Sequence, residues 1–274
     1  MVNEINKNPM PNLELNINSN LGANPKLFDR FIEKLKPIIE EKKVREFKLF
    51  TSIDTWDKGK AEYIRNGLDV ELFERNLNKY LTEIKDSKVS LMITFNNLCV
   101  TNFDSLLEQI LVWREKYNDK TAEERGNINQ PIPVQRIQMD TPYLKEPPHY
   151  DMNILPKDDF THHMDRHLEF MINSKDDDDN TKFKTIEVEK FRRVVDYFKS
   201  AEVDEDYLRK GRSDFYNFFA EHDRRRDTDF IKAFPEYEEF YNSCRLSTTK
   251  TQRAIRLEQR RAEMMRRKQN DKVD

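Results

Sequence analysis

Polar side chains that could bind a ligand follow four short apolar segments of the sequence. Ligands of parallel α/β proteins bind outside the carboxyl ends of the strands, so groups of this kind are candidates for a binding site if the segments are strands. A simpler explanation also exists for each residue alone, because backbone that leaves a sheet needs side-chain partners. The candidates are Asn20 after the first segment, Ser52, Asp54 and Arg65 after the second, Thr94 and Asn96 after the third, and Asp140 after the fourth.

The four segments read as strands separated by helices. Leu13–Ser19 alternates apolar and polar residues, and Val89–Phe95 is a nearly continuous apolar run, as in strands covered on both faces. Strands are also predicted from Phe47 to Ser52 and over Val134–Met139, and helices are predicted from Pro25 to Ile39, over Val70–Leu81 and from Asn102 or Asp104. This βαβαβαβ order predicts an α/β fold with a parallel sheet and right-handed crossovers.

The character of the chain changes after Pro142. A segment rich in proline and aromatic residues comes first, and helical patterns follow at about 158–171, 185–198, 206–219 and 227–241. We therefore expect three parts: a partial β/α barrel over 1–155, a helical extension over 156–245 and an Arg-rich helical tail over 246–274. Residues Met1 to Asn12 are polar and contain two prolines, so we expect a loop or a ragged start there.

Charge and cysteine content narrow the class of protein. In this 274-residue chain, 48 Lys and Arg residues nearly balance 51 Asp and Glu residues. This balance argues against the positive electrostatic field of a nucleic-acid-binding protein. The only two cysteines, Cys99 and Cys244, are far apart and indicate no disulfide framework. No apolar stretch is as long as a membrane span, and the N-terminus lacks the apolar core of a signal peptide. We expect a cytoplasmic protein with no membrane contact.

Two clusters of potential metal ligands have simpler explanations. His163 and His167 are four residues apart on a predicted helix, but the sequence lacks the glutamate of a zinc-protease motif and a clear third ligand. The acidic run from Asp176 to Asp179 lacks the alternating spacing and the glycine of a calcium-binding loop. We predict no metal site at either.

The stretch SIDTWDKGKAEYIRNGLD, which begins at Ser52, resembles the fourth strand and following loop of radical S-adenosylmethionine (SAM) enzymes with a shortened, twitch-type C-terminal extension. In that family a strand ends in Ser-Ile-Asp or a similar sequence, and a polar loop closes on Tyr-Ile-Arg-x-Gly-Leu-Asp. The stretch NINSNLGANPKLFDRFIEKL is similar to the turn and helix after the third strand. The likeness extends from about Leu13 to Tyr150 and more loosely beyond.

The resemblance implies a SAM site at the strand ends. Ser52 and Asp54 would lie near the ribose and Arg65 near the methionine carboxylate, with Asn20 and Thr94 in the same cavity; Asn96 and Asp140 end the neighbouring strands. Family members hold a [4Fe-4S] cluster through a CxxxCxxC motif, because three thiolates leave one iron open to SAM. They cleave SAM to a radical that abstracts hydrogen, often from a peptide or protein.

The 274 residues contain no CxxxCxxC motif and no Gly-Gly-Glu turn. The resemblance therefore implies the C-terminal part of such an enzyme, whose cluster needs another chain or fragment that carries the first two β/α units. The strand Leu13–Ser19 would then have an open edge that promotes association. Two alternatives remain: a non-catalytic binding module that retains a half-barrel, and an unrelated α/β enzyme with Asp54 and Asp140 as acid and base.

Overall fold

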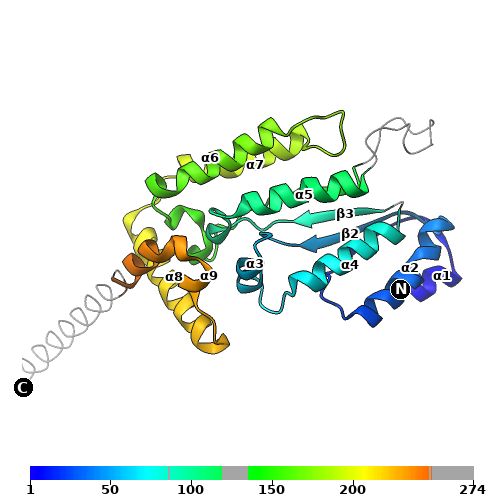
Figure 1. Ribbon diagram of the computed structural model, residues 1–274, viewed down its shortest axis with the longest axis horizontal. Coiled ribbons are helices and arrows are strands. Elements are labelled where there is room, and N and C mark those ends of the chain that lie inside the picture. The colour runs from blue at the N-terminus through cyan, green and yellow to red at the C-terminus, as the bar shows by residue number, and fades with distance from the viewer. Residues whose placement is uncertain (86, 119–134, 247, 249–274) are drawn as a thin grey trace, which may run out of the picture. The chain divides into compact units, whose positions relative to one another are not determined.

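Four parallel strands alternate with helices, and a mostly helical region follows (Figure 1). This computed structural model describes residues 1–85, 87–118, 135–246 and 248. The strands lie in the sheet in sequence order, each parallel to the next, as the sequence predicted. They are β1 (Met10–Asn18), β2 (Val44–Ser52), β3 (Lys88–Met92) and β4 (Ile137–Asp140).

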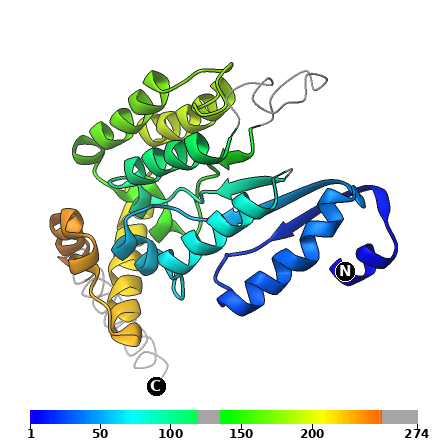
Figure 2. The same ribbon diagram turned by 45° about the vertical axis from the view of Figure 1, so that its right-hand side comes forward.

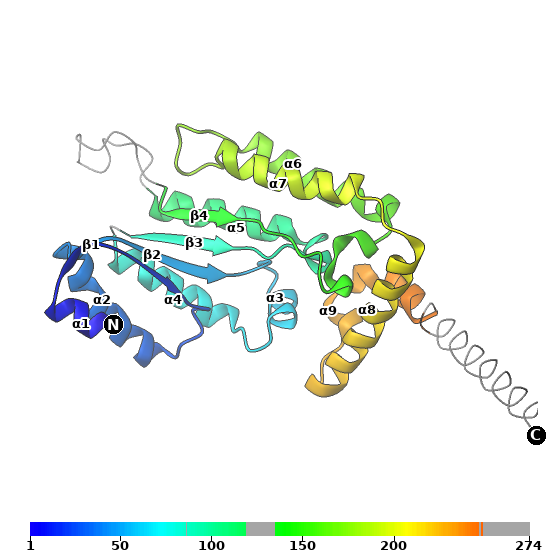
Figure 3. The same cartoon turned by 180° about the vertical axis from the view of Figure 1, so that it is seen from behind.

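The crossover helices lie on one face of this sheet. Figure 1 shows them in front of the strands, and Figure 3, turned by 180°, looks onto the opposite face. They are α2 (Pro25–Glu40), α4 (Val70–Glu83) and α5 (Phe103–Tyr117), whereas the short helix α3 (Lys58–Ile64), which precedes α4, lies beyond the carboxyl end of β2. This arrangement follows from the right-handed crossover rule, because strands added in one direction place every helix on the same side.

Strand side chains divide accordingly into a buried row and a second row that is mostly polar and, apart from buried Ser90, less buried. The strand pairing aligns Leu15 with Phe47 and Leu49 with Val89, and these residues lie under the helices. The buried row consists of Leu15, Phe47, Leu49, Thr51, Val89, Leu91, Ile137 and Met139. The alternate residues form the second row, which we call the open face: Glu14, Asn16, Asn18, Glu46, Lys48, Phe50, Ser52, Lys88, Ser90, Met92, Gln138 and Asp140.

Local sequence signals set the helix boundaries. Asn24 caps α2 by accepting a hydrogen bond from the Leu27 N–H (3.0 Å), and Pro25 occupies the first helical position. Asp69 caps α4 in the same way through the Leu72 N–H (2.9 Å). The short helix α1 (Val2–Lys7) lies beside α2 (Figure 2), where the Asn6 amide donates to the Lys34 carbonyl (2.8 Å).

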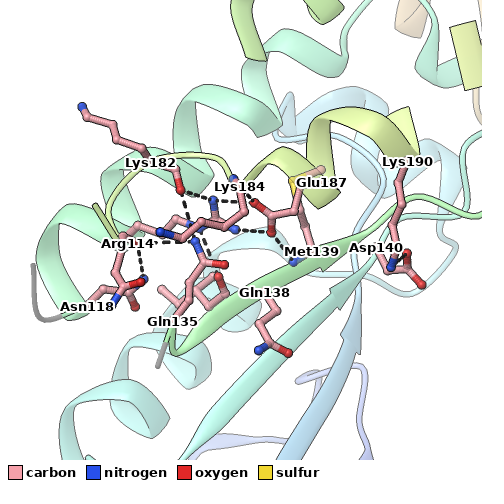
Figure 4. A network of polar contacts seen from close by, with 12 residues as sticks. Arg114, Asn118, Gln135, Gln138, Met139, Asp140, Lys182, Lys184, Glu187 and Lys190 are labelled. Carbon is pink, nitrogen blue, oxygen red and sulfur yellow. Dashed lines mark hydrogen bonds and ion pairs between the residues drawn. The ribbon is translucent and has the colours of Figure 1, made fainter. Parts of the chain in front are cut away.

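A buried ion pair connects the edge of the sheet to a later helix. Arg114 on α5 donates from Nη2 to Glu187 Oε1 (2.6 Å) and from Nη1 to Oε2 (3.1 Å), and its Nε donates to the Ile137 carbonyl (3.0 Å) of β4 (Figure 4). Glu187 belongs to α7 (Thr185–Ser200), which pairs with α6 (Lys157–Asn173). The contacts attach α7 to β4 and α5.

The chain divides into two compact units. The first contains Met1–Leu144 and Lys157–Ser200, so α6 and α7 belong with the sheet. The second contains Lys145–Pro156 and the described residues from Ala201 onward. Its elements are the 3-10 turns η2 (Pro148–Tyr150) and η3 (Met152–Ile154), the helices α8 (Glu205–Arg226) and α9 (Phe230–Ala233), the 3-10 turn η4 (Pro235–Tyr237), and a helical stretch over 238–246.

Within the second unit, Gly211 of α8 packs tightly against η3. A Cβ at this position would lie only 2.6 Å from Ile154 Cγ2 and 3.4 Å from the Pro148 carbonyl oxygen. The neighbouring Arg212 also joins α8 to η3, because its Nε donates to the Ile154 carbonyl (2.8 Å). The close approach of α8 to η3 therefore requires glycine.

Several elements differ from the sequence prediction. Met1 to Asn12 contains α1 and the start of β1, not a loop. The polar loop after β2 includes α3, capped by Asp57 through the Lys60 N–H (3.1 Å). The helix expected at 227–241 is interrupted after Ala233, because Pro235 cannot continue the hydrogen-bond ladder. Val134, the first residue of the expected fourth strand, and most of the Arg-rich tail lie outside the described residues.

No helix among the described residues is both long enough and apolar enough to cross a membrane.

Candidate functional site

Asp54, Arg65 and Thr94 form one hydrogen-bonded cluster at the carboxyl ends of β2 and β3. Asp54 Oδ1 accepts from Arg65 Nη2 (2.9 Å) and from the Thr94 N–H (3.0 Å), and Arg65 Nε lies 2.7 Å from Asp54 Oδ2. Arg65 comes from the C-terminal cap of α3. Asp54 thus joins the end of α3 to the end of β3.

Burial differs sharply within this cluster. The Asp54 side chain is 4% exposed, whereas that of Arg65 is 31% exposed. Burial raises the pKa of the Asp54 carboxyl, and the Arg65 guanidinium and the Thr94 N–H oppose this rise. Asp54 Oδ1 accepts two hydrogen bonds and Oδ2 is in ion-pair contact with Arg65, and the carboxylate is buried, so the group that the cluster presents to a ligand is the partly exposed guanidinium of Arg65.

Asn96 shapes the turn after β3. Its Oδ1 accepts from the Leu98 N–H (2.9 Å) and its Nδ2 donates to the Thr94 carbonyl (2.9 Å). These bonds begin the 3-10 turn η1 (Asn97–Cys99), and Asn96 itself is buried. Asn96 therefore holds the backbone beside Asp54 and does not face solvent.

Asn20 stands on the exposed turn after β1. Its Oδ1 accepts from the Gly22 N–H (3.0 Å), and the following Leu21 has a φ of 53°. The buried amide of Asn76 on α4 fixes this turn by donating to the carbonyls of Leu21 (2.8 Å) and Ala23 (2.9 Å). No contact of Asn20 with the Asp54 cluster is present among the described residues.

Ser52 and Asp140 belong to the open face instead. Ser52 ends β2 and is half-buried. Asp140 ends β4, and its Oδ1 accepts from Lys190 Nζ of α7 at 2.8 Å (Figure 4). The seven predicted residues thus divide into a buried cluster with Arg65 at its surface, an exposed turn at Asn20, and two positions on the open face.

Sequence reasoning missed the lysines of the open face. Lys48 Nζ donates to Gln138 Oε1 (2.7 Å), reaching from β2 across β3 to β4, and lies 5.0 Å from the centre of the Phe50 ring. Lys88 donates to Glu46 Oε1 (2.7 Å). Partial burial lowers the pKa of Lys48, and the neighbouring Lys88 charge adds to this effect. The strict alternation of Glu46, Lys48 and Phe50 with buried residues was the signal that could have identified this face.

Both cysteines are buried thiols. Burial raises the pKa of Cys99 well above its usual value, and the nearby Asp54 charge raises it further. Burial also raises the pKa of Cys244 to about 12. Since an iron–sulfur cluster needs thiolates, and at least three of them in the family that the sequence resembles, the cysteines of this chain do not fit a [4Fe-4S] site.

The histidines and the acidic loop have local structural partners. His167 is buried, and its Nε2 lies 2.8 Å from the Val100 carbonyl oxygen. His163 is partly buried, and this burial lowers its pKa to about 4. In the acidic loop, Lys184 Nζ donates to three backbone carbonyls, those of Asp176 (3.3 Å), Asp177 (2.8 Å) and Asp179 (3.0 Å). Across the described residues, no group of three or more His, Cys, Asp or Glu side chains could hold a metal ion.

Comparison with known proteins gives no relative: no protein-family model, no curated protein and no solved structure matches this chain.

Proposed function

We propose that this chain is a radical SAM-like protein that binds SAM at the carboxyl ends of its strands. In this proposal it forms the C-terminal part of a cytoplasmic enzyme that acts on a peptide or protein. The observation that supports it most directly is the Asp54–Arg65–Thr94 cluster, because three residues named by the resemblance meet through hydrogen bonds at one place.

The partly exposed guanidinium of Arg65 suits the methionine carboxylate of SAM. A guanidinium presents a rigid fork of donors that matches a carboxylate, and Asp54 holds that fork in one orientation. Asp54 is then a positioning residue that acts through Arg65, and not a direct ribose ligand. The hydroxyl of Ser52 on the open face is the better candidate for contact with the ribose.

In this proposal another polypeptide supplies the iron–sulfur cluster. Cys99 and Cys244 cannot hold it, because both are buried and a [4Fe-4S] cluster of this family needs three thiolates. When bound, a [4Fe-4S] cluster supplies the electron for reductive cleavage of SAM. We propose that a polypeptide with the first two β/α units carries its three thiolates and pairs with β1. The residues of this chain would bind SAM and orient it.

Calorimetric titration of the purified chain with SAM tests the binding site. We expect saturable binding that Arg65→Ala weakens by about tenfold to a hundredfold, the usual cost of a lost charged hydrogen bond. Asp54→Asn weakens binding less, because Arg65 remains but loses its orientation. The matched control is Arg45→Ala, which removes an exposed guanidinium, paired with Glu14, at the amino end of β2.

Absence of SAM binding, or equal affinity of the Arg65→Ala variant and the unaltered chain, would contradict the proposal. The second candidate, a non-catalytic binding module that retains the half-barrel, is favoured by the buried, inert state of both cysteines. It predicts a folded chain with no response to SAM, even when a cluster-bearing fragment is added. An acid–base pair of Asp54 and Asp140 receives less support, because Asp54 is occupied by Arg65 and Thr94 and Asp140 by Lys190.

A further inference from the structure

The outer edge of β1 has hydrogen-bonding groups directed away from the sheet. β1 lies at the end of the strand order and pairs with β2 alone among the described strands (Figure 3). The Ser19 N–H donates to the Phe50 carbonyl on β2 (2.9 Å). Since the backbone groups of successive strand residues alternate in direction, those of 15 and 17 also point to β2, whereas those of 14, 16 and 18 point outward.

Among the described residues, the second half of this edge has few of the features by which proteins usually protect edge strands. Charged side chains, prolines, bulges and covering segments discourage edge-to-edge pairing. In β1, Pro11 and the irregular pairing between Met10 and Glu14 affect only the first half of the strand. From 14 to 18 the one ionisable side chain is Glu14, and it is already paired with Arg45 of β2.

We propose that two copies of this chain pair through the outer edges of their β1 strands, in an antiparallel arrangement centred on Asn16. In this register Asn16 meets Asn16 of the second copy, and Glu14 meets Asn18. The amide of Asn18 can donate to the Glu14 carboxylate, and no like charges face one another. Leu15 then lies opposite Ile17 on the helix-covered face. The edge is self-complementary, as a twofold interface requires.

Exposed apolar residues of β1 also favour a second copy of the chain at this edge. Met10 is 43% exposed and Leu13 is 36% exposed, although both belong to a strand. A second sheet placed against the edge would reduce the exposure of Leu13. The pairing does not depend on the ligand at the strand ends, and it describes the chain in the absence of the partner polypeptide proposed above.

Sedimentation velocity over a dilution series tests the proposal. We expect a concentration-dependent monomer–dimer equilibrium. Asn16→Pro removes the outward N–H without touching the β2 ladder, and should raise the dimer dissociation constant by about thirtyfold, since two central hydrogen bonds are lost. Asn16→Ala keeps that N–H and should leave the constant nearly unchanged.

A second variant avoids any effect of proline on folding. Asn16→Lys places two ammonium groups directly opposite one another across the twofold axis and should raise the dissociation constant by roughly fivefold. Leu27→Lys introduces the same charge on α2, where the side chain is 58% exposed, and serves as the matched control.

Amide hydrogen exchange identifies the contacting edge. At concentrations that favour the dimer, the amides of Glu14, Asn16 and Asn18 should become protected, whereas those of Leu15 and Ile17 should be protected at every concentration. A chain that is monomeric throughout would overturn the proposal. So would a dimer that Asn16→Pro and Asn16→Lys leave intact, or one in which the amides of 14, 16 and 18 exchange freely.

Discussion

Arg114 and Glu187 form a two-pronged ion pair whose members are almost fully buried, with side chains 0% and 6% exposed. Glu187 also accepts from the backbone N–H of Met139 (3.3 Å) and of Lys184 (3.0 Å). One carboxylate therefore joins α5, β4 and the start of α7. This pair, and not apolar packing alone, attaches α7 to the edge of the sheet.

Arg114→Met should lower the free energy of unfolding by about 3–5 kcal/mol, because it leaves the Glu187 carboxylate buried without its partner. Urea denaturation followed by circular dichroism measures this change. The control, Arg192→Met, removes an exposed guanidinium that pairs with Glu189 on α7, the helix of Glu187. It should change the free energy of unfolding by less than about 1 kcal/mol. Adding Glu187→Leu to Arg114→Met should restore part of the loss; equal effects of Arg114→Met and Arg192→Met would refute this role.

Gly211→Ala should destabilise the chain by about 1–3 kcal/mol, since the new methyl group would overlap Ile154. Gly59→Ala is the matched control. It lies in α3 with only an ordinary contact to Asp57 at 3.6 Å, and should raise stability by about 0.5–1 kcal/mol through helix propensity. Ile154→Ala combined with Gly211→Ala tests the cause, because the smaller side chain should make the alanine at 211 less costly than it is alone.

Cys99 and Cys244 should resist thiol reagents in the native chain, because burial keeps both as thiols. We expect negligible reaction with a colorimetric disulfide reagent under native conditions and two equivalents in denaturant. Anaerobic reconstitution with iron and sulfide should likewise give no stable [4Fe-4S] absorbance. A stoichiometric cluster that is lost on Cys99→Ser would show that this expectation is wrong.

His163 should make stability depend on pH in the acidic range. Partial burial lowers its pKa from 6.5 to about 4, so the unfolded chain binds the proton more readily than the native chain between these values. The contribution of His163 is complete above pH 6.5 and declines as the pH falls toward 4. His163→Gln should therefore reduce the loss of stability over this interval, measured by urea denaturation at several pH values. Parallel curves for the variant and the unaltered chain would contradict this.

The strand order was predictable because each strand carries its own signal. Alternation in Leu13–Ser19 and the apolar run at Val89–Phe95 lie within single segments, and the right-handed crossover rule then determines the sheet. The early start of β1 at Met10 was not predictable in this way. Its first residues gain their strand conformation from β2, through the Met10 N–H bond to the Lys43 carbonyl (2.7 Å), and no local pattern reveals that contact.

The candidate site was predictable only in part. Polar residues at strand ends identified Asp54 and Thr94, but not that Asp54 would be buried under Arg65. Whether a polar side chain faces a ligand or supports its neighbour depends on the helix α3, which the sequence presented as loop. The lysines of the open face were missed because their partners lie on other strands: Gln138 lies two strands from Lys48, and Glu46 lies on the strand beside Lys88.

The order of strands in the sheet also bears on how the chain is made. Among the described strands, β2, β3 and β4 each pair with the strand that directly precedes them in the sequence. A nascent chain leaving the ribosome can therefore complete β1, α2 and β2 as a unit, and then add one β/α unit at a time to the same growing side. Among the described strands, none is added to the side of β1 away from β2 as the sheet grows, so a chaperone or another strand can approach that side while β2, β3 and β4 are added.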